Sequence, residues 1–293
     1  MVASKNSRVY QIIGEDNVYF YSLAEMSMFM GEQGNEFTSD PEEGQLQLPE
    51  LIANCHILFL DKKASSSGKI KPPMARDLLD YYTADQLRAH FLGLGLGKRS
   101  VGFQPKPLNP NAGERDGDPV LKEGNLLSNV FNRAVRSCFY TTQEYYNGII
   151  PVGEVSGEVL EESNAAILKF EEAMYRHEFH LAMSTVDNYI RRMNKYWDKN
   201  MRLARDNGDE KLRRQTVIDL FHMVRIAAVL MHPVAPEGTE MIREFLNLGE
   251  EFWSWDRIFD PIYTFMQDPE AHRPKFLEPR VDFFGKHPSQ VRS

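Results

Sequence analysis

Apolar positions recur every three or four residues through most of the second half of the chain. Each such stripe predicts one buried face of an amphipathic helix. The three stripes are Leu126, Leu127, Val130, Phe131 and Ala134; Phe179, Ala182, Val186, Tyr189, Ile190, Met193 and Trp197; and Val217, Leu220, Phe221, Val224, Ala228 and Met231. Pro233 and Pro236 end the third stripe, because proline breaks a helix. Several long amphipathic helices predict a helix bundle from Leu121 onward.

The first 60 residues have a different pattern, in which strands and a helix alternate. Strand-forming residues at positions 9–13 lead into a turn at 14–16, and a helical stretch follows as far as Met30. The polar segment 31–45 predicts a surface insertion. The uninterrupted apolar run at 57–60 (Ile-Leu-Phe-Leu) predicts a fully buried strand. Two strands separated by a helix predict part of a parallel α/β sheet.

The α/β segment continues past Pro73, and a connection follows it. Apolar residues at roughly helical spacing after Pro73 predict one amphipathic helix, with Leu78, Leu79, Tyr82, Leu87 and Phe91 on its apolar face. Residues 93–119 are rich in Gly, Pro, Asn and Asp, and predict a long surface connection. We therefore expect an α/β segment over 1–92, a connection over 93–119 and a helical domain over 120–293.

Composition restricts the class of protein. The 293 residues are 42% hydrophobic and 26% charged, which is typical of a folded protein with one or two domains. No run of 18 apolar residues predicts a membrane span, and the N-terminus lacks the pattern of a secretory signal. Cys55 and Cys138 have no metal-ligand spacing, so we expect two free thiols, no zinc site and a cytoplasmic protein.

The charge is distributed unevenly. A net charge of −8 argues against indiscriminate binding to nucleic acid. Between residues 188 and 214, however, nine basic residues face four acidic ones. The basic residues are Arg191, Arg192, Lys195, Lys199, Arg202, Arg205, Lys211, Arg213 and Arg214. This segment is either a local phosphate-binding surface or a solvated helix face.

A loop with lysines and serines at 62–69 follows the apolar run at 57–60. Open parallel sheets bind their ligands at the carboxyl ends of strands, and lysine and hydroxyl groups there suit the charge on a phosphate chain. The alternative is a solvated turn.

The first helix of the predicted bundle carries Asn and Arg four residues apart in two frames, Asn129 with Arg133 and Asn132 with Arg136. Either pair shares one helix face, and both residue types can contact base edges in pairs of hydrogen bonds. Trp197, inside the basic segment, offers an indole on which an unpaired RNA base can stack. A surface polar pair and a core tryptophan are the simpler alternatives.

The order of these motifs resembles the C-terminal half of the methionyl-tRNA synthetases, which are class I aminoacyl-tRNA synthetases. Gly14, Asp16 and Phe20 match a family segment, of which Gly14 and Asp16 are implied to bind the adenosine of ATP. Phe20 and Tyr21 stand where the family lines its methionine pocket, and Tyr21 replaces a histidine.

The loop after the apolar run resembles the KMSKS loop of the same family, which binds ATP phosphates. Lys63, Ser65 and Ser67 match it, whereas Ala64 replaces methionine and Ser66 replaces the second lysine. Lys69 lies close enough in the sequence to substitute for that lysine, and unchanged activity of a Lys69→Ala complete enzyme would count against this.

The resemblance also implies an anticodon site. The segment from Leu127 to Arg133, with Phe139 following, resembles the family's Asn-x-x-x-Arg segment and favours Asn129 and Arg133 over the second frame. Trp197 matches the tryptophan that stacks on the anticodon, although Tyr196 replaces the preceding proline.

The resemblance therefore implies part of a Rossmann-like catalytic domain followed by an all-helical anticodon-binding bundle. The whole enzyme would join methionine to methionine tRNA, with ATP and Mg²⁺ as substrate. The family's HIGH motif does not occur in the sequence, so we expect this chain alone to be inactive, with a separate HIGH-containing half as a further candidate partner. The alternatives are a non-catalytic tRNA-binding module and a purely structural bundle.

Overall fold

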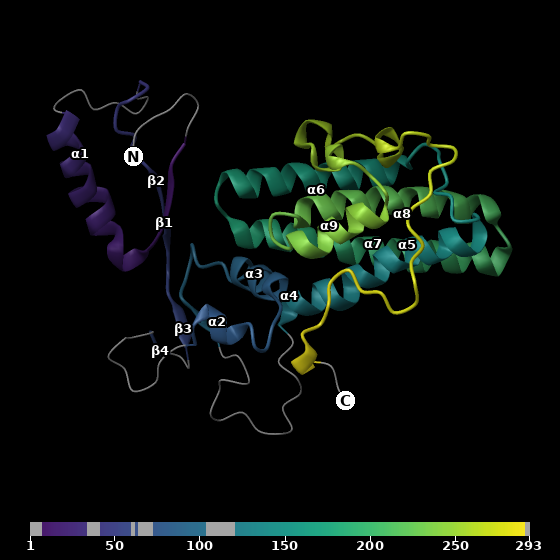
Figure 1. Ribbon diagram of the computed structural model, residues 1–293, viewed down its shortest axis with the longest axis horizontal. Helices are drawn as coiled ribbons and strands as arrows, with labels where there is room; N and C mark the ends of the chain where they lie inside the picture. Colours follow the sequence, from purple (N-terminus) through teal and green to yellow (C-terminus); the bar gives the residue numbers. More distant parts are fainter. Residues whose placement is uncertain (1–7, 34–41, 60–61, 64–72, 104–120, 291–293) are drawn as a thin grey trace. The chain divides into compact units, whose positions relative to one another are not determined.

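The computed structural model describes residues 8–33, 42–59, 62–63, 73–103 and 121–290. Contacts divide the chain into two compact units (Figure 1). The first, which we call the sheet unit, comprises Met1–Pro72 and Gly95–Asn111; the second, the helical unit, comprises Pro73–Leu94 and Ala112–Ser293. Contacts thus group residues 73–94 with the helices, whereas the sequence pattern placed most of them with the α/β segment.

Parallel pairing holds the first half of the sheet unit together. Strand β1 (Tyr10–Gly14) pairs in parallel with β2 (Glu50–Asn54), with Ile12 opposite Ile52. A 3-10 turn (Glu15–Asn17), a π-helical turn (Phe20–Ala24) and helix α1 (Glu25–Gln33) follow β1 in the sequence. The predicted first strand and the helix after it are therefore confirmed, but the parallel partner of β1 is β2 and not the predicted strand at 57–60, which lies in another sheet.

A second small sheet has the order β4-β3-β5. Strand β3 (Ile57–Phe59) pairs in parallel with β5 (Val101–Phe103) and antiparallel with β4 (Lys62–Lys63). The prediction that 93–119 is only a surface connection is thus wrong at β5. The prediction of a fully buried strand is also wrong, because Phe59 is buried but Ile57 and Leu58 are half-buried; Leu60 lies outside the described residues. A sheet of so few strands leaves most of its side chains partly uncovered.

The single helix predicted after Pro73 is two helices, α2 (Ala75–Leu78) and α3 (Ala84–Gly93). A reciprocal cap starts α3: the Thr83 hydroxyl accepts from Gln86 N (3.3 Å), and the Gln86 side chain accepts from Thr83 N (3.0 Å). This capping box satisfies backbone groups at a helix start and so separates the two helices. Buried Tyr82 packs in the turn between them.

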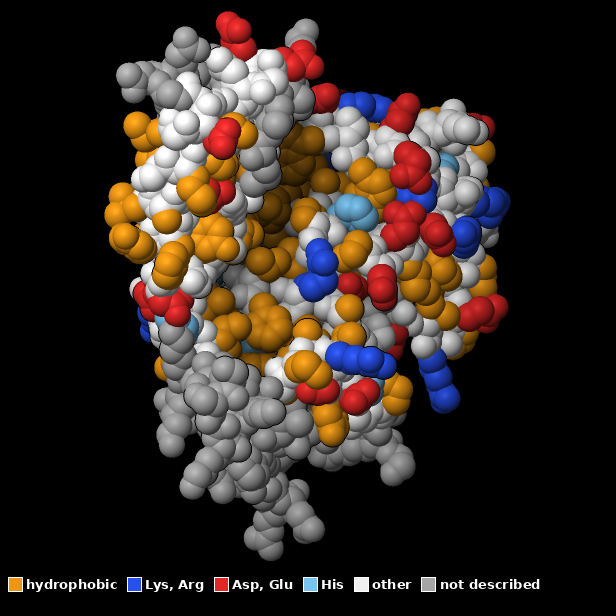
Figure 2. Space-filling model, turned by 60° about the vertical axis from the view of Figure 1, so that its left-hand side comes forward, with side chains coloured by type: hydrophobic (Ala, Val, Ile, Leu, Met, Phe, Trp, Pro, Cys, Tyr) orange, Lys and Arg blue, Asp and Glu red, His pale blue; other side chains and the backbone are white. Residues whose placement is uncertain are grey.

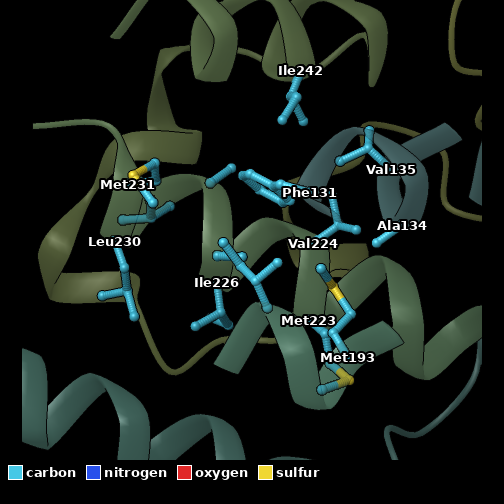
Figure 3. Close-up of a cluster of buried hydrophobic side chains, with 14 of the residues drawn as sticks. Phe131, Ala134, Val135, Met193, Met223, Val224, Ile226, Leu230, Met231 and Ile242 are labelled. Carbon is cyan, nitrogen blue, oxygen red and sulfur yellow. The ribbon is translucent and has the colours of Figure 1, made fainter. Parts of the chain in front are cut away.

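The helical unit is built around α8 (Glu210–Met231), in which every residue from Thr216 to Met231 is buried. The other helices of this part of the chain are α4 (Lys122–Asn125), α5 (Asn132–Tyr145), α6 (Gly157–Tyr175), α7 (Phe179–Asn207) and α9 (Pro236–Phe245). A π-helical turn (Leu126–Phe131) joins α4 to α5. Figure 3 shows side chains from α5, α7, α8 and α9 converging in the core. The predicted helices are therefore confirmed, and most of the residues of the three stripes are buried.

Short 3-10 segments continue the chain after α9, at Glu250–Trp253, Trp255–Arg257, Ile262–Phe265 and Pro288–Gln290. Buried Arg225 of α8 holds the chain at the end of the second of these segments by donating to three backbone carbonyls, those of Ile258 (2.9 Å), Asp260 (3.2 Å) and Arg257 (3.0 Å). Its guanidinium also lies 4.0 Å from the centre of the Phe265 ring. No helix among the described residues is long and apolar enough to cross a membrane.

Candidate functional site

Asn129 lies in the π-helical turn that leads into α5, and its side chain is exposed. Its amide donates to the Asn125 side chain one turn earlier. Arg133 lies one turn further on, in α5, and is also exposed. The spacing therefore puts both side chains on one accessible face, as predicted from the sequence.

Arg133 is held by an ion pair with α7. Its Nη2 atom lies 2.6 Å from Oδ1 of Asp198, the residue after Trp197. A second contact joins the same two regions, because Asn194 Nδ2 donates to the carbonyl of Val130 (3.0 Å), the residue after Asn129. Two polar contacts thus place the Asn129–Arg133 face beside the part of α7 that carries Trp197.

The second Asn–Arg frame has a different environment. Asn132 is fully buried, where its amide donates to the carbonyls of Ser128 and Phe284, both at 2.9 Å. Its Oδ1 atom accepts from Phe284 N (3.0 Å), so the side chain holds the C-terminal segment against α5. Arg136 pairs with Asp282 (2.6 Å) in the same segment. Of the two frames, only Asn129 with Arg133 has both side chains at the surface.

Trp197 is half-buried and lines a groove of about 530 Å³, which we call the Trp197 groove. Helices α5, α7 and the start of α8 form it, with Thr141, Glu144, Tyr145, Trp197, Asp198, Met201, Arg202, Arg205 and Arg213 as its lining. Three arginines face two carboxylates there; Arg133 pairs with one of the carboxylates, Asp198, and Glu210 pairs with one of the arginines, Arg213. The groove is therefore locally basic in a protein with a net charge of −8.

Ion pairs reduce the charge of the basic segment elsewhere. Arg191 pairs with Asp187 (2.6 Å), and Arg192 pairs with both Glu158 (2.7 Å) and Glu162 (2.8 Å). These two arginines belong to the solvated, paired face of α7. The arginines that line the Trp197 groove lie further along the same helix and at the start of α8.

Asp219 is a structural residue that the sequence did not single out. It is fully buried on α8, where it accepts from Ser156 N (2.8 Å), the Ser156 hydroxyl (2.6 Å), Gln215 (3.0 Å) and the Tyr196 hydroxyl. Burial and then the hydrogen bond to Asp219 raise the pKa of Tyr196. The Tyr196 side chain thus anchors the α7 turn that carries Trp197. The available signal was an aspartate within the long apolar run of α8.

Gly14 and Asp16, the predicted adenosine-binding residues, lie at the carboxyl end of β1. A β-carbon at Gly14 would lie 2.8 Å from Asp16 Oδ1, so glycine gives that carboxylate its space. His56, after β2, lies between two acids: Nδ1 is 2.9 Å from Glu15 Oε1 and Nε2 is 3.5 Å from Asp16 Oδ2. The sequence did not single out His56, since 40 residues separate it from Asp16.

Phe20 and Tyr21, the predicted methionine-pocket residues, are exposed by 61% and 40%. The rings of Tyr19 and Phe20 meet edge to face at 5.6 Å. Among the described residues, the structure therefore does not enclose a pocket around either side chain.

The KMSKS-like loop is described only in part. The backbone of Lys63 pairs with Leu58 in β3, which places it at the end of the hairpin strand β4. Ser65, Ser67 and Lys69 lie outside the described residues. Among the residues that the structure describes, no cluster of three or more His, Cys, Asp or Glu could hold a metal ion. Cys55 and Cys138 are free thiols.

Solved structures share this fold. The methionyl-tRNA synthetase of Mycobacterium tuberculosis bound by methionyl-adenylate matches with a TM-score of 0.70 and 18% identity, over 94% of this chain and 50% of that one. The apo form of the same enzyme matches with a TM-score of 0.65 and 18% identity, over 95% of this chain and 49% of that one.

Curated relatives agree with this match, although no family model matches the sequence. Methionine–tRNA ligase 1 of Alkaliphilus oremlandii is 24% identical over 253 residues, which are 86% of this chain and 42% of the relative. The methionine–tRNA ligase of Bacillus cereus is 21% identical over 251 residues, with 85% and 42% covered. This chain therefore spans less than half the length of these relatives and is similar to the C-terminal part of the methionine–tRNA ligases, as its motif order predicted.

Proposed function

We propose that the helical unit binds the anticodon loop of methionine tRNA. The observation that carries this proposal is the Arg133–Asp198 ion pair, which joins the exposed Asn129–Arg133 face to the turn of α7 that carries Trp197. Arginine and asparagine can contact base edges, and an indole can stack on an unpaired base. These two kinds of contact are what recognition of a single-stranded loop requires.

Each group has a distinct task in this proposal. Asn129 and Arg133 hydrogen-bond to the edges of anticodon bases, while Asp198 fixes the direction of the Arg133 guanidinium. Trp197 stacks on a neighbouring base. The groove arginines Arg202 and Arg205 contact phosphates, and the net negative charge of the rest of the chain disfavours other nucleic acids.

The test compares tRNAs that differ only in the anticodon. We expect the full chain to bind methionine tRNA more tightly than the anticodon variants, and Trp197→Ala to remove most of that preference. Trp255→Ala is the matched control, because Trp255 is a partly exposed tryptophan outside the Trp197 groove. If Trp197→Ala leaves selective binding intact, the anticodon assignment fails.

The sheet unit fits the same proposal as part of an ATP-dependent methionine–tRNA ligase. Gly14 and Asp16 would contact the adenosine of ATP, Phe20 and Tyr21 the methionine side chain, and Lys63, Ser65, Ser67 and Lys69 the phosphates. Methionine carboxylate would attack the α-phosphorus and pyrophosphate would leave with Mg²⁺. The methionyl group would then pass from the adenylate to a hydroxyl of the terminal adenosine of the tRNA, and AMP would leave. Positioning and charge stabilisation suffice for this reaction, without a covalent nucleophile from the protein.

The sheet unit exposes an apolar surface, which favours a further part of the nucleotide-binding fold packing against it. Figure 2 shows apolar side chains spread over this unit. The exposed apolar side chains of this unit include Tyr10, Ile12, Tyr19, Phe20, Leu23, Met28 and Met30. Soluble proteins seldom leave so large a set of apolar side chains uncovered. We propose that a polypeptide carrying the rest of the nucleotide-binding fold covers them, which agrees with a chain that spans 42% of its relatives.

A non-catalytic tRNA-binding module is the second candidate. The exposure of Phe20 and Tyr21 and the replacements Ala64 and Ser66 favour it. Both candidates use the same anticodon contacts, and a cytoplasmic location suits both. The candidates differ in whether a complete enzyme containing this chain activates methionine, which ATP–pyrophosphate exchange measures.

A further inference from the structure

Tyr145 also lines the Trp197 groove, on α5 rather than α7. It is the last residue of α5 and 47% of its surface is exposed. The proposed contacts of the Asn129–Arg133 face and of Trp197 give this exposed tyrosine no role. A groove of about 530 Å³ also has the volume of a site for a small ligand, so it has room for more than the face of one indole.

Arg213 supports the Tyr145 ring from one side. Its guanidinium carbon lies 4.2 Å from the centre of the ring, which is the geometry of a cation–π contact. The Arg213 side chain is only 17% exposed and forms an ion pair with Glu210, which also accepts from the Tyr146 hydroxyl (2.9 Å). Arg213 is therefore fixed by its neighbours, and it covers one face of a ring whose other surface stays accessible.

The charges around Tyr145 suit a nucleotide. Hydrogen bonding with Glu144 and its charge raise the pKa of the Tyr145 hydroxyl, so the ring stays neutral. Arg202 lines the same groove, and none of the ion pairs among the described residues involves it. Arg205 also lines the groove, with only a 3.5 Å pair to the exposed Asp206. The groove thus combines an aromatic ring at each of two helices with arginines available to phosphate.

We propose that Tyr145, backed by Arg213, is a second stacking platform for an unpaired RNA base, beside the platform that Trp197 provides. Arg202 and Arg205 bind the phosphates next to that base. The proposal rests on the proposed function, since it takes the ligand of the Trp197 groove to be a single-stranded loop. It extends that function, because Tyr145, which is not one of the predicted anticodon residues, would hold a second nucleotide of the loop.

The test measures binding of the full chain to an RNA hairpin with the anticodon stem and loop of methionine tRNA. Tyr145→Ala should weaken binding about tenfold, a typical loss for one stacked base. Tyr145→Phe should change it less than twofold, because the ring remains. Tyr175→Ala is the matched control, since Tyr175 is a 76% exposed tyrosine on α6, outside the groove. Thermal unfolding of each variant checks that it folds.

Abasic substitution at each loop position identifies the base. One abasic hairpin should bind the wild-type chain about tenfold more weakly, yet bind Tyr145→Ala as well as the intact hairpin does. Trp197→Ala should retain its sensitivity to that same position. If Tyr145→Ala responds to every abasic position as the wild-type chain does, the second platform is wrong.

Two outcomes separate this inference from the proposed function. If Trp197→Ala weakens binding and Tyr145→Ala does not, the second platform is overturned and the anticodon assignment remains in place. If Trp197→Ala leaves binding unchanged as well, both the second platform and the anticodon assignment are overturned. Arg202→Ala should lower the slope of log affinity against log salt by about 0.7, which corresponds to one phosphate contact of a single strand, and an unchanged slope overturns the phosphate role.

Discussion

Arg133 Nη2 lies 2.6 Å from Asp198 Oδ1, and this ion pair joins the start of α5 to the middle of α7. Both side chains are exposed, so the pair contributes little to stability, on the order of 0.5 kcal/mol. Its effect is on direction: the pair orients a guanidinium that would otherwise sample many rotamers. Exposed pairs of this kind matter for recognition more than for folding.

Asp198→Ala should therefore change selectivity rather than stability. Without its partner, Arg133 loses its fixed direction, while the groove loses a negative charge that repels phosphate. We expect the preference for the correct anticodon to fall about tenfold and the affinity for variant tRNAs to rise. The measurement is the ratio of dissociation constants for the two kinds of tRNA. Asp206→Ala, at another exposed acid of α7, should leave that ratio unchanged.

The two asparagines of the alternative frames should separate folding from binding. Asn132→Ala leaves the buried backbone groups of Phe284 without their partner, so it should lower the free energy of unfolding by about 1–3 kcal/mol. Asn129→Ala removes only an exposed side chain and should change stability by less than about 0.5 kcal/mol while weakening anticodon selectivity. Urea unfolding and tRNA binding of both variants check this. The reverse result would restore the second frame.

His222 should make the helical unit sensitive to acid. It is buried on α8 and hydrogen-bonds to no described residue, and burial, followed by the charge of Arg225, lowers its pKa from 6.5 to about 4. The folded state thus favours the neutral ring, so stability is present above pH 6.5 and is lost as the pH falls towards 4, by up to about 3 kcal/mol. All three tryptophans lie in the helical unit, so their fluorescence during urea unfolding follows this loss.

His222→Leu should flatten that pH dependence, because the leucine cannot take up a proton. His287→Ala, at a half-buried histidine of the same unit whose ring contacts Ser289, is the control and should keep the dependence of the wild-type chain. If the free energy of unfolding falls equally with pH between 6.5 and 4 in the wild-type chain, His222→Leu and His287→Ala, a buried neutral His222 is contradicted.

Asp85 should act in the opposite direction. Burial is the main cause that raises its pKa from 3.8 to about 6, while its carboxylate accepts from Gly238 N (3.3 Å) at the start of α9. Ionised Asp85 therefore costs stability, and this cost builds up as the pH rises from about 3.8 to about 6 and is fully present above that. Asp85→Asn keeps an acceptor for Gly238 and should raise stability by about 1 kcal/mol at pH 8 but hardly at pH 4. A destabilised variant at pH 8 would contradict this.

The sequence predicted the helical unit well because each stripe lies within one helix. Local periodicity is enough to find such elements. The stripe in α8 predicted one buried face, whereas the second half of this helix is buried on all sides. By contrast, β5 is three residues long and exists through pairing with β3, more than 40 residues earlier. No local pattern predicts such a strand. The break at Thr83 had a local signal, Thr-Ala-Asp-Gln, which is a capping box.

The candidate site divides in the same way. The spacing of Asn129 and Arg133 within one helix predicted their shared face. Their neighbours Asn194 and Asp198 come from another helix, and His56 meets Asp16 through the pairing of β1 with β2. Such contacts depend on tertiary structure, so the sequence alone could not place them.

The full chain alone should show no methionine-dependent ATP–pyrophosphate exchange. The sequence has no HIGH motif and has Ser66 where the family has its second KMSKS lysine, so only one side of the phosphates would be held. Charge stabilisation of this kind needs groups already in place on both sides of the reacting phosphorus. Phe20 and Tyr21 are also exposed, which leaves methionine without an enclosed pocket among the described residues. A polypeptide carrying the HIGH motif and the rest of the fold should restore exchange when mixed with this chain, and Phe20→Ala should lower the restored rate. Robust exchange by the chain alone would refute the requirement for a second half.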